Sequence, residues 1–69
     1  MCDGMCGSLI DQLIAIRKQR GMTQRDLAAA ANLAQPAIAR LERKAATPQL
    51  HTVLKVLDAL DQKLTVVPK

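Results

Sequence analysis

The chain has 69 residues, of which 49% are hydrophobic, 23% are charged and none is aromatic, and its formal charge is +4. This length and composition predict one small globular domain and exclude an intrinsically disordered chain. The lack of an apolar run of about eighteen residues excludes a membrane-spanning helix. No basic region precedes an N-terminal apolar stretch, so we expect no secretory signal and a cytoplasmic protein.

The positive charge is concentrated in the middle of the sequence. Residues 1–16 carry a net charge of −2, residues 17–44 carry +5, and residues 45–69 carry +1. A basic centre indicates a polyanionic partner, most simply a nucleic acid. Proteins that bind single strands or RNA usually stack bases on aromatic rings, which this chain lacks. Double-stranded DNA is therefore the favoured partner.

The first residues contain two cysteines, Cys2 and Cys6, ahead of the periodic part of the sequence. A disulfide scaffold needs cysteines spread across the fold, and a zinc site needs about four ligands, to which only the distant His51 could contribute. We expect residues 1–7 to form a disordered tail without metal or cofactor, with a metal or redox site as the alternative. His51 is expected on a helix surface, and no Ser or Cys is arranged with it for catalysis, so no enzyme is predicted.

Apolar residues at spacings of three and four predict two helices in the first half of the chain. The first is expected over residues 8–20, with Ser8 as its N-cap and Gly21 ending it. The second is expected over residues 24–31, with Thr23 as its N-cap and an acidic residue three positions later.

Two further helices are expected after a sharp turn at Asn32, a residue type that tolerates the left-handed conformation. The first of them spans residues 35–43 and has Pro36 in its first turn, where the missing N–H costs little. The second spans residues 48–60, with Thr47 as its cap and Pro48 at its first position. Its expected buried stripe consists of Leu50, Val53, Leu54, Leu57 and Leu60.

Two short helices joined by a tight turn, with the second one basic and bearing short outward side chains, form a helix-turn-helix motif. The second helix of such a motif enters the major groove of DNA. From Leu13 to Leu60 the sequence resembles the Cro/CI-type, or Xre, helix-turn-helix family. The segments "LIAIR", "GMTQRDLA" and "IARLER", followed by Pro48 and a leucine-rich last helix, are in register with the family pattern. The resemblance implies an all-α, lambda-repressor-like domain of four to five helices over residues 8–61.

The resemblance also implies roles for individual residues. Arg17 and Glu42 match a buried ion pair that ties the first helix to the recognition helix. The base-facing positions are Gln35, Pro36, Ala37 and Arg40. The phosphate-contacting positions are Thr23, Gln24, Arg25, Arg43 and Lys44.

Two departures from the family pattern stand out. The loop after the recognition helix usually carries Gly where this chain has Lys44. Pro36 and Ala37 offer few hydrogen bonds to bases, so DNA shape or bridging water would supply part of the specificity.

The last residues, 62–69, differ from the rest because they are β-branched and alternate in polarity. A short strand is predicted at Leu64, Thr65, Val66 and Val67. Since nothing else in the chain resembles a strand, it would pair with a second copy, pair with another protein, or remain disordered. An antiparallel ribbon across a twofold axis would give a homodimer suited to a palindromic operator.

The leading interpretation is a dimeric, sequence-specific DNA-binding repressor. Short family members with a strand after the last helix resemble HipB-like antitoxins, which bind their operator and also a toxin protein, so the resemblance implies a toxin as a second partner. The alternative is a protein-interaction module for which DNA binding is incidental.

Overall fold

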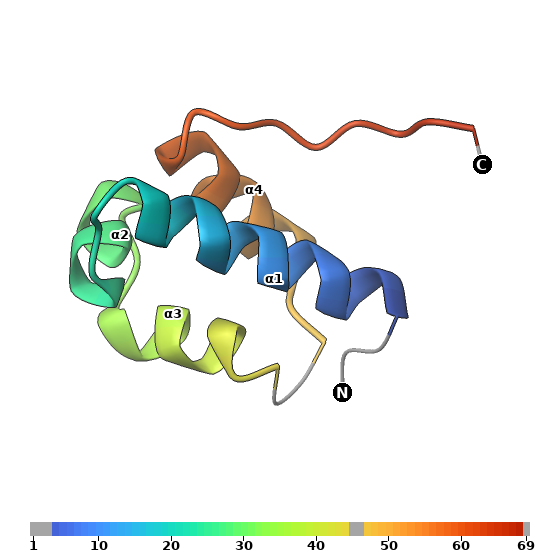
Figure 1. Cartoon of the computed structure of the whole chain (residues 1–69). Helices are drawn as coiled ribbons and strands as arrows, with labels where there is room; N and C mark the ends of the chain where they lie inside the picture. The colour runs from blue at the N-terminus through green and yellow to red at the C-terminus, as the bar shows by residue number, and fades with distance from the viewer. Residues whose placement is uncertain (1–3, 45–46, 69) are drawn as a thin grey trace.

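The computed structural model describes residues 4–44 and 47–68, apart from the side chains at positions 5 and 6. Figure 1 shows four helices in these residues: α1 (Gly4–Gln19), α2 (Gln24–Ala30), α3 (Gln35–Glu42) and α4 (Leu50–Ala59). The predicted all-helical architecture is thus confirmed. No helix in the described part of the chain has the length and apolar character needed to cross a membrane.

Helix α1 begins four residues earlier than the sequence predicted. The expected start at Ser8 is wrong, because residues 4–7 are helical and Ser8 lies inside the helix. Neither Gly4 nor Gly7 has the positive φ that would interrupt a helix, and a helical glycine costs only about 1 kcal/mol. Of the predicted N-terminal tail, residues 1–3 and the side chain of Cys6 lie outside the described residues.

The N-terminus of α2 is formed as predicted by Thr23. The Asp26 N–H donates to the Thr23 hydroxyl at 3.0 Å, and the Thr23 N–H donates to the Asp26 carboxylate at 2.9 Å. This reciprocal pair is a capping box, which satisfies two backbone donors that the helix itself leaves unpaired.

The break between α2 and α3 lies at Asn32, as predicted, since its φ is +58°. The N–H of Leu33 donates to the carbonyl of Ala28 at 2.8 Å, which closes the end of α2. Helix α3 then begins with Ala34 as an N-cap that makes no side-chain hydrogen bond, and Pro36 lies in its first turn. The turn therefore divides this helical segment into two helices, and α3 runs in a different direction from α2.

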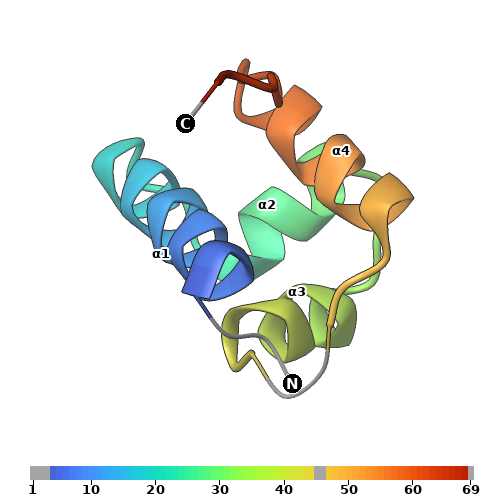
Figure 2. The same cartoon turned by 90° about the vertical axis from the view of Figure 1, so that its right-hand side faces the viewer.

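The core consists of aliphatic side chains from all four helices. Its fully buried members include Ile10 of α1, Leu27 of α2, Ile38 of α3 and Val56 of α4. The small residues Ala28 and Ala31 are also buried, which lets neighbouring helices approach closely. The rest of the core consists of Leu13, Leu41, Val53, Leu57 and Leu60. In the view of Figure 2, α2 lies between α1 and α4, and α3 lies along one edge of the bundle.

Helix α4 differs from its prediction in its start and in its buried face. It begins at Leu50, after Gln49 as an extended N-cap, so the predicted cap at Thr47 is wrong. Pro48 lies in the preceding loop, next to α3. Leu50 and Leu54 are 61% and 45% exposed, whereas Val56 is fully buried. Because α4 is apolar on more than one face, the sequence alone did not determine which face meets the core.

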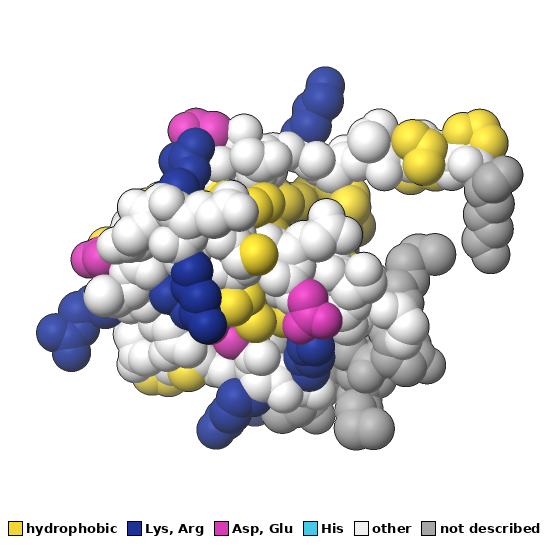
Figure 3. Space-filling model, viewed as in Figure 1, with side chains coloured by type: hydrophobic (Ala, Val, Ile, Leu, Met, Phe, Trp, Pro, Cys, Tyr) yellow, Lys and Arg dark blue, Asp and Glu magenta, His cyan; other side chains and the backbone are white. Residues whose placement is uncertain are grey.

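The predicted C-terminal strand is not formed, and no strand occurs in residues 4–44 or 47–68. Residues 62–68 are extended and exposed, and Figure 1 shows them running along one side of the bundle. The physical reason is that a lone segment has no neighbouring strand with which to exchange hydrogen bonds. Val66 and Val67 are 94% and 70% exposed, and Figure 3 shows hydrophobic side chains at the surface of this segment.

Candidate nucleic-acid interface

The outer face of α3 is open to solvent. Ile38 and Leu41 fix the helix to the core on its inner side. On the outer side, Gln35, Pro36 and Arg40 are exposed. Ala37 lies between them and is half-buried, where it lines a shallow opening toward the loop before α4. The four side chains that the sequence assigned to base contact thus come from one exposed helix.

Several cationic side chains on α2, on α3 and at the end of α3 are exposed. Arg40, Arg43 and Arg25 are exposed, and none of them forms an ion pair with another described residue. Figure 3 shows Lys and Arg side chains projecting over the part of the molecule that contains α2 and α3. Unpaired surface cations of this kind remain available for a polyanion.

Lys44 occupies a different environment from the arginines. It is half-buried, and its ammonium group forms an ion pair with Asp11 of α1. Its φ is +57°, in the region that favours glycine. The structure therefore explains the glycine of the family pattern at this position: the chain reverses direction after α3, and this residue makes the turn.

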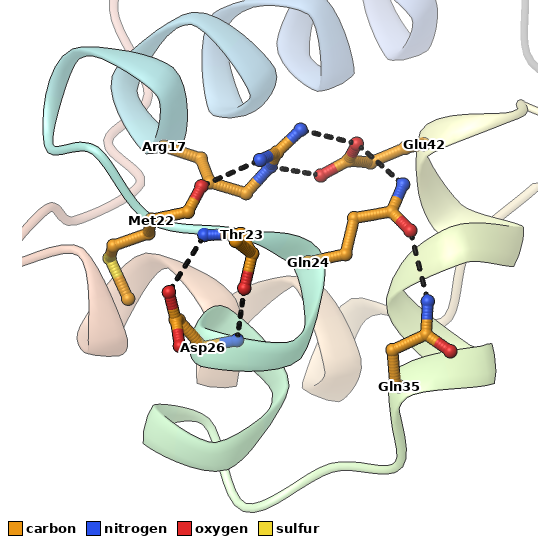
Figure 4. A network of polar contacts seen from close by, with 7 residues as sticks. All are labelled: Arg17, Met22, Thr23, Gln24, Asp26, Gln35 and Glu42. Atoms are coloured by element: carbon orange, nitrogen blue, oxygen red, sulfur yellow. Dashed lines mark hydrogen bonds and ion pairs between the residues drawn. The ribbon is translucent and has the colours of Figure 1, made fainter.

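Arg17 and Glu42 lie together between α1 and α3 (Figure 4). The Arg17 Nε donates to Glu42 Oε2 at 2.7 Å, and Nη2 donates to Oε1 at 3.0 Å. Only 10% and 11% of the two side chains are exposed. Arg17 also donates to the Met22 carbonyl at 2.7 Å, so the guanidinium connects α1, the loop before α2, and α3.

Two glutamines extend this polar cluster toward the surface, as Figure 4 shows. The Gln24 Nε2 donates to Glu42 Oε1 at 3.1 Å. The Gln35 Nε2 in turn donates to Gln24 Oε1 at 3.0 Å. The sequence assigned Gln24 and Gln35 to DNA separately and missed their mutual contact. No pattern could have revealed it, because the two residues belong to different helices whose relative placement is a tertiary property.

Thr23 and Asp26 are both exposed near this cluster but are engaged with each other. The hydrogen bond from the Thr23 N–H is the main reason why the pKa of Asp26 lies below its ordinary value. Asp26 thus carries a full negative charge at neutral pH and holds the start of α2 in place.

The side chains of this surface are chemically suited to binding. In the described residues, no three His, Cys, Asp or Glu side chains gather in a way that could hold a metal ion. His51 is exposed on α4. What the surface offers is an amide at Gln35, guanidinium groups at Arg40 and Arg43, and short side chains between them. These groups suit base edges and phosphates.

Comparison with known proteins agrees with this geometry. The helix-turn-helix family model matches residues 13–67, which is most of the chain. The chain is 43% identical over 61 residues to an uncharacterized HTH-type transcriptional regulator of Haemophilus influenzae, covering 88% of this chain and 62% of that protein. It is 34% identical over 59 residues to the antitoxin HigA1 of Mycobacterium tuberculosis, covering 86% of this chain and 40% of the antitoxin. The chain thus spans less than two thirds of either protein.

Solved structures show the same fold. A chain from a toxin–antitoxin module of Streptococcus pneumoniae matches with a TM-score of 0.78 and 42% identity, over 93% of this chain and 70% of that one. A chain from the HipA-HipB-O2-O3 complex matches with a TM-score of 0.86 and 25% identity, over 99% of this chain and 96% of that one.

Proposed function

Since the chain belongs to the helix-turn-helix family, we propose that it is a cytoplasmic transcriptional repressor that binds double-stranded DNA sequence-specifically, as a dimer on a palindromic operator. The observation that carries this proposal is the exposed outer face of α3, with Gln35 and Arg40 on it and Arg43 at its end. A helix held at the edge of a bundle by its inner side can enter the major groove with its outer side.

Direct base contact falls mainly to two side chains of α3. The Gln35 amide can pair with an adenine, and the Arg40 guanidinium can pair with a guanine or a phosphate. Pro36 and Ala37 can pack against the DNA through van der Waals contacts, but their side chains form no hydrogen bond. DNA shape and bridging water therefore supply part of the specificity.

The residues proposed to contact phosphates lie around the motif. Their side chains differ in how free they are to bind a phosphate. Arg25 and Arg43 are exposed and unpaired within the described residues. Lys44 has to exchange Asp11 for a phosphate. Thr23 keeps its capping role, and Gln24 retains one N–H beyond the bond to Glu42. The arginines are accordingly the main source of salt-dependent affinity.

The proposed dimer is supported by the short length of the recognition helix. Helix α3 has 8 residues, so it is about 12 Å long and covers about four base pairs. Two copies on a twofold axis read two half-sites about 34 Å apart. We assign the contact between copies to the apolar side chains of the C-terminal segment, Leu64, Val66 and Val67, next to the open groove between α1 and α4.

A second candidate function, which is compatible with the first, is that of an antitoxin. It is favoured by the similarity to the antitoxin HigA1 and to chains in a toxin–antitoxin module and in the HipA-HipB-O2-O3 complex. An antitoxin of this kind binds its operator and a toxin protein. We expect a growth-arresting protein to be encoded beside this chain, and co-expression with this chain to relieve the arrest.

The repressor proposal is tested by fluorescence anisotropy with palindromic duplexes selected from a randomised pool. The Arg40→Ala, Arg43→Ala double variant should bind at least tenfold more weakly and lower the salt slope by about two. A matched control is Lys55→Ala, Lys63→Ala, which removes the same charge from exposed positions outside the interface. Equal binding by the two double variants would contradict the proposal.

A further inference from the structure

Among the cations predicted to contact phosphates, Lys44 is the one that has an anionic partner within the described part of the chain. Its ammonium group forms an ion pair with the carboxylate of Asp11 on α1. The other two cations of that set, Arg25 and Arg43, are exposed and form no ion pair with a described residue. A phosphate that approaches Lys44 therefore meets a carboxylate that already occupies the ammonium group.

The backbone fixes the position from which the Lys44 side chain reaches Asp11. The Lys44 N–H donates to the Leu41 carbonyl at 3.2 Å, and φ at Lys44 is +57°, so the chain turns directly after α3. Two residues earlier, Glu42 binds Arg17 of α1, the same helix that carries Asp11. The attachment of α3 to α1 thus holds both ends of the ion pair, which belongs to the folded domain before DNA is bound.

The ion pair is open enough to be exchanged. Of the two side chains, 33% of Lys44 and 64% of Asp11 are accessible to solvent. An ammonium group has three donors, so a phosphate can bind it from the open side, but the nearby Asp11 carboxylate repels that phosphate. Because ion pairs of this exposure are weak, the competition should lower the affinity for DNA by only about two- to fivefold.

We propose that Asp11 is an intramolecular competitor of the DNA backbone for Lys44, and that it limits the affinity of the protein for DNA of any sequence. This inference rests on the proposed DNA-binding function. Because phosphates carry no sequence information, weakening a phosphate contact lowers the affinities for operator and non-operator DNA by the same factor. Asp11 thus leaves the base preference of α3 unchanged and reduces the sequence-independent part of binding.

The first test measures affinity by fluorescence anisotropy on two duplexes of equal length. One is selected by the wild-type chain from a randomised pool, and the other is its scrambled sequence. Asp11→Asn should bind both duplexes about two- to fivefold more tightly than the wild type, with an unchanged ratio between them. The matched control, Asp58→Asn, removes the same charge from an exposed position of α4. Equal gains from the two substitutions, or a changed ratio in Asp11→Asn, would overturn the proposal.

The second test asks whether the gain in affinity depends on the ammonium group of Lys44. Lys44→Met removes the charge and keeps an unbranched side chain. In this background, Asp11→Asn should raise the affinities no more than Asp58→Asn does. A gain as large as that in the wild type would show that Asp11 repels DNA directly, and the competition for Lys44 would be refuted.

The salt dependence of binding gives a further readout, which a purely structural ion pair would not change. Each phosphate that the protein neutralises adds about one to the slope of log affinity against log salt concentration. Lys44→Met should lower this slope by about one in the Asp11→Asn background and by less when Asp11 is present. Equal reductions in the two backgrounds would contradict the competition.

The outcomes separate this inference from loss of folding and from failure of the proposed function. An unstable Asp11→Asn variant would bind DNA more weakly, which is the opposite of the expected result, and thermal unfolding identifies it. Asp11→Ala, which also removes the carboxylate and favours a helix, should show the same gain. If the wild-type chain selects a duplex and neither variant binds it more tightly, this inference alone fails. If the wild-type chain binds neither duplex, the proposed function fails as well.

Discussion

At the scale of single residues, backbone conformation separates tolerated positions from strained ones. Asn32, Lys44 and Asp61 all have φ values near +57° in the described residues. Asn and Asp accept this conformation because their short side chains bond locally, whereas Lys has no such compensation and is disfavoured by about 1–2 kcal/mol. At position 44 the chain therefore carries a residue that is less stable in this conformation than glycine would be.

We expect Lys44→Gly to stabilise the fold by about 0.5 kcal/mol. Relief of the left-handed strain outweighs the loss of the partly exposed ion pair with Asp11, which contributes at most about 0.5 kcal/mol. The melting temperature should rise by about 2–4 °C in thermal unfolding followed by circular dichroism. Lys44→Ala loses the ion pair but keeps the strain, so it should not be stabilised. A glycine variant that melts below the alanine variant would contradict this account.

Asp26 makes the stability of α2 depend on pH. Its pKa is lowered, chiefly by the hydrogen bond from the Thr23 N–H, so the folded state favours the ionised carboxylate. The stabilisation is complete above the pKa of the unfolded chain and is lost as the pH falls through the lower pKa of the folded one. Urea unfolding of Asp26→Asn should therefore show a smaller loss of stability on acidification than the wild type. Identical acid profiles for the two proteins would show that the capping box has no such effect.

At the scale of elements, the placement of α3 depends on one ion pair and on the core. Ile38 and Leu41 supply the apolar contact, and Arg17 holds Glu42 at the end of the helix through two hydrogen bonds. A charge pair this far from water is sensitive to the loss of one partner, because the other is left uncompensated.

Glu42→Ala should consequently destabilise the domain by about 3 kcal/mol, because it leaves the Arg17 charge buried without a partner. The double variant Arg17→Met, Glu42→Leu should recover most of that loss, because it replaces both charges with apolar groups. Equilibrium urea unfolding measures both values. Arg20→Ala serves as the comparison, since it breaks the exposed Arg20–Asp61 pair, in which 41% and 81% of the side chains are accessible, and should cost less than about 1 kcal/mol. Similar losses for Glu42→Ala and Arg20→Ala would mean that burial of the pair has no energetic importance.

At the scale of the whole molecule, the core is small, and several large apolar side chains remain exposed to solvent. Leu60 is fully buried, yet Leu50, Val66 and Val67 are largely exposed. A domain of this size is only marginally stable, and burial of further apolar surface in a dimer would add to its stability.

We expect the wild-type chain to sediment as a dimer and its melting temperature to rise with protein concentration. Val66→Asp, Val67→Asp should shift it to a monomer with a melting temperature independent of concentration, because two charges would have to be desolvated in the contact. Lys55→Asp changes the charge by the same amount at an exposed position of α4 that does not line this groove, and it is the control for charge alone. A monomeric wild-type chain, or a dimer that survives the valine substitutions, would refute the assignment of this contact.

By itself the sequence determined the local features of this protein. The turn at Asn32, the cap at Thr23, the stop at Gly21 and the position of Pro36 in the first turn of α3 are each decided by neighbouring residues. Charge patterning and the resemblance to a known family then predicted which helix would face DNA. These features could be predicted because caps, turns and left-handed residues depend on short stretches of chain.

The tertiary structure alone decided what depends on packing between distant segments. It selected Val56 rather than Leu54 for the core, and it left residues 62–68 without a strand. It also brought the side chains of Gln24 and Gln35 together at 3.0 Å. Such contacts arise from the relative placement of helices, which is set by the fit of the whole core, so no local pattern in the sequence specifies them.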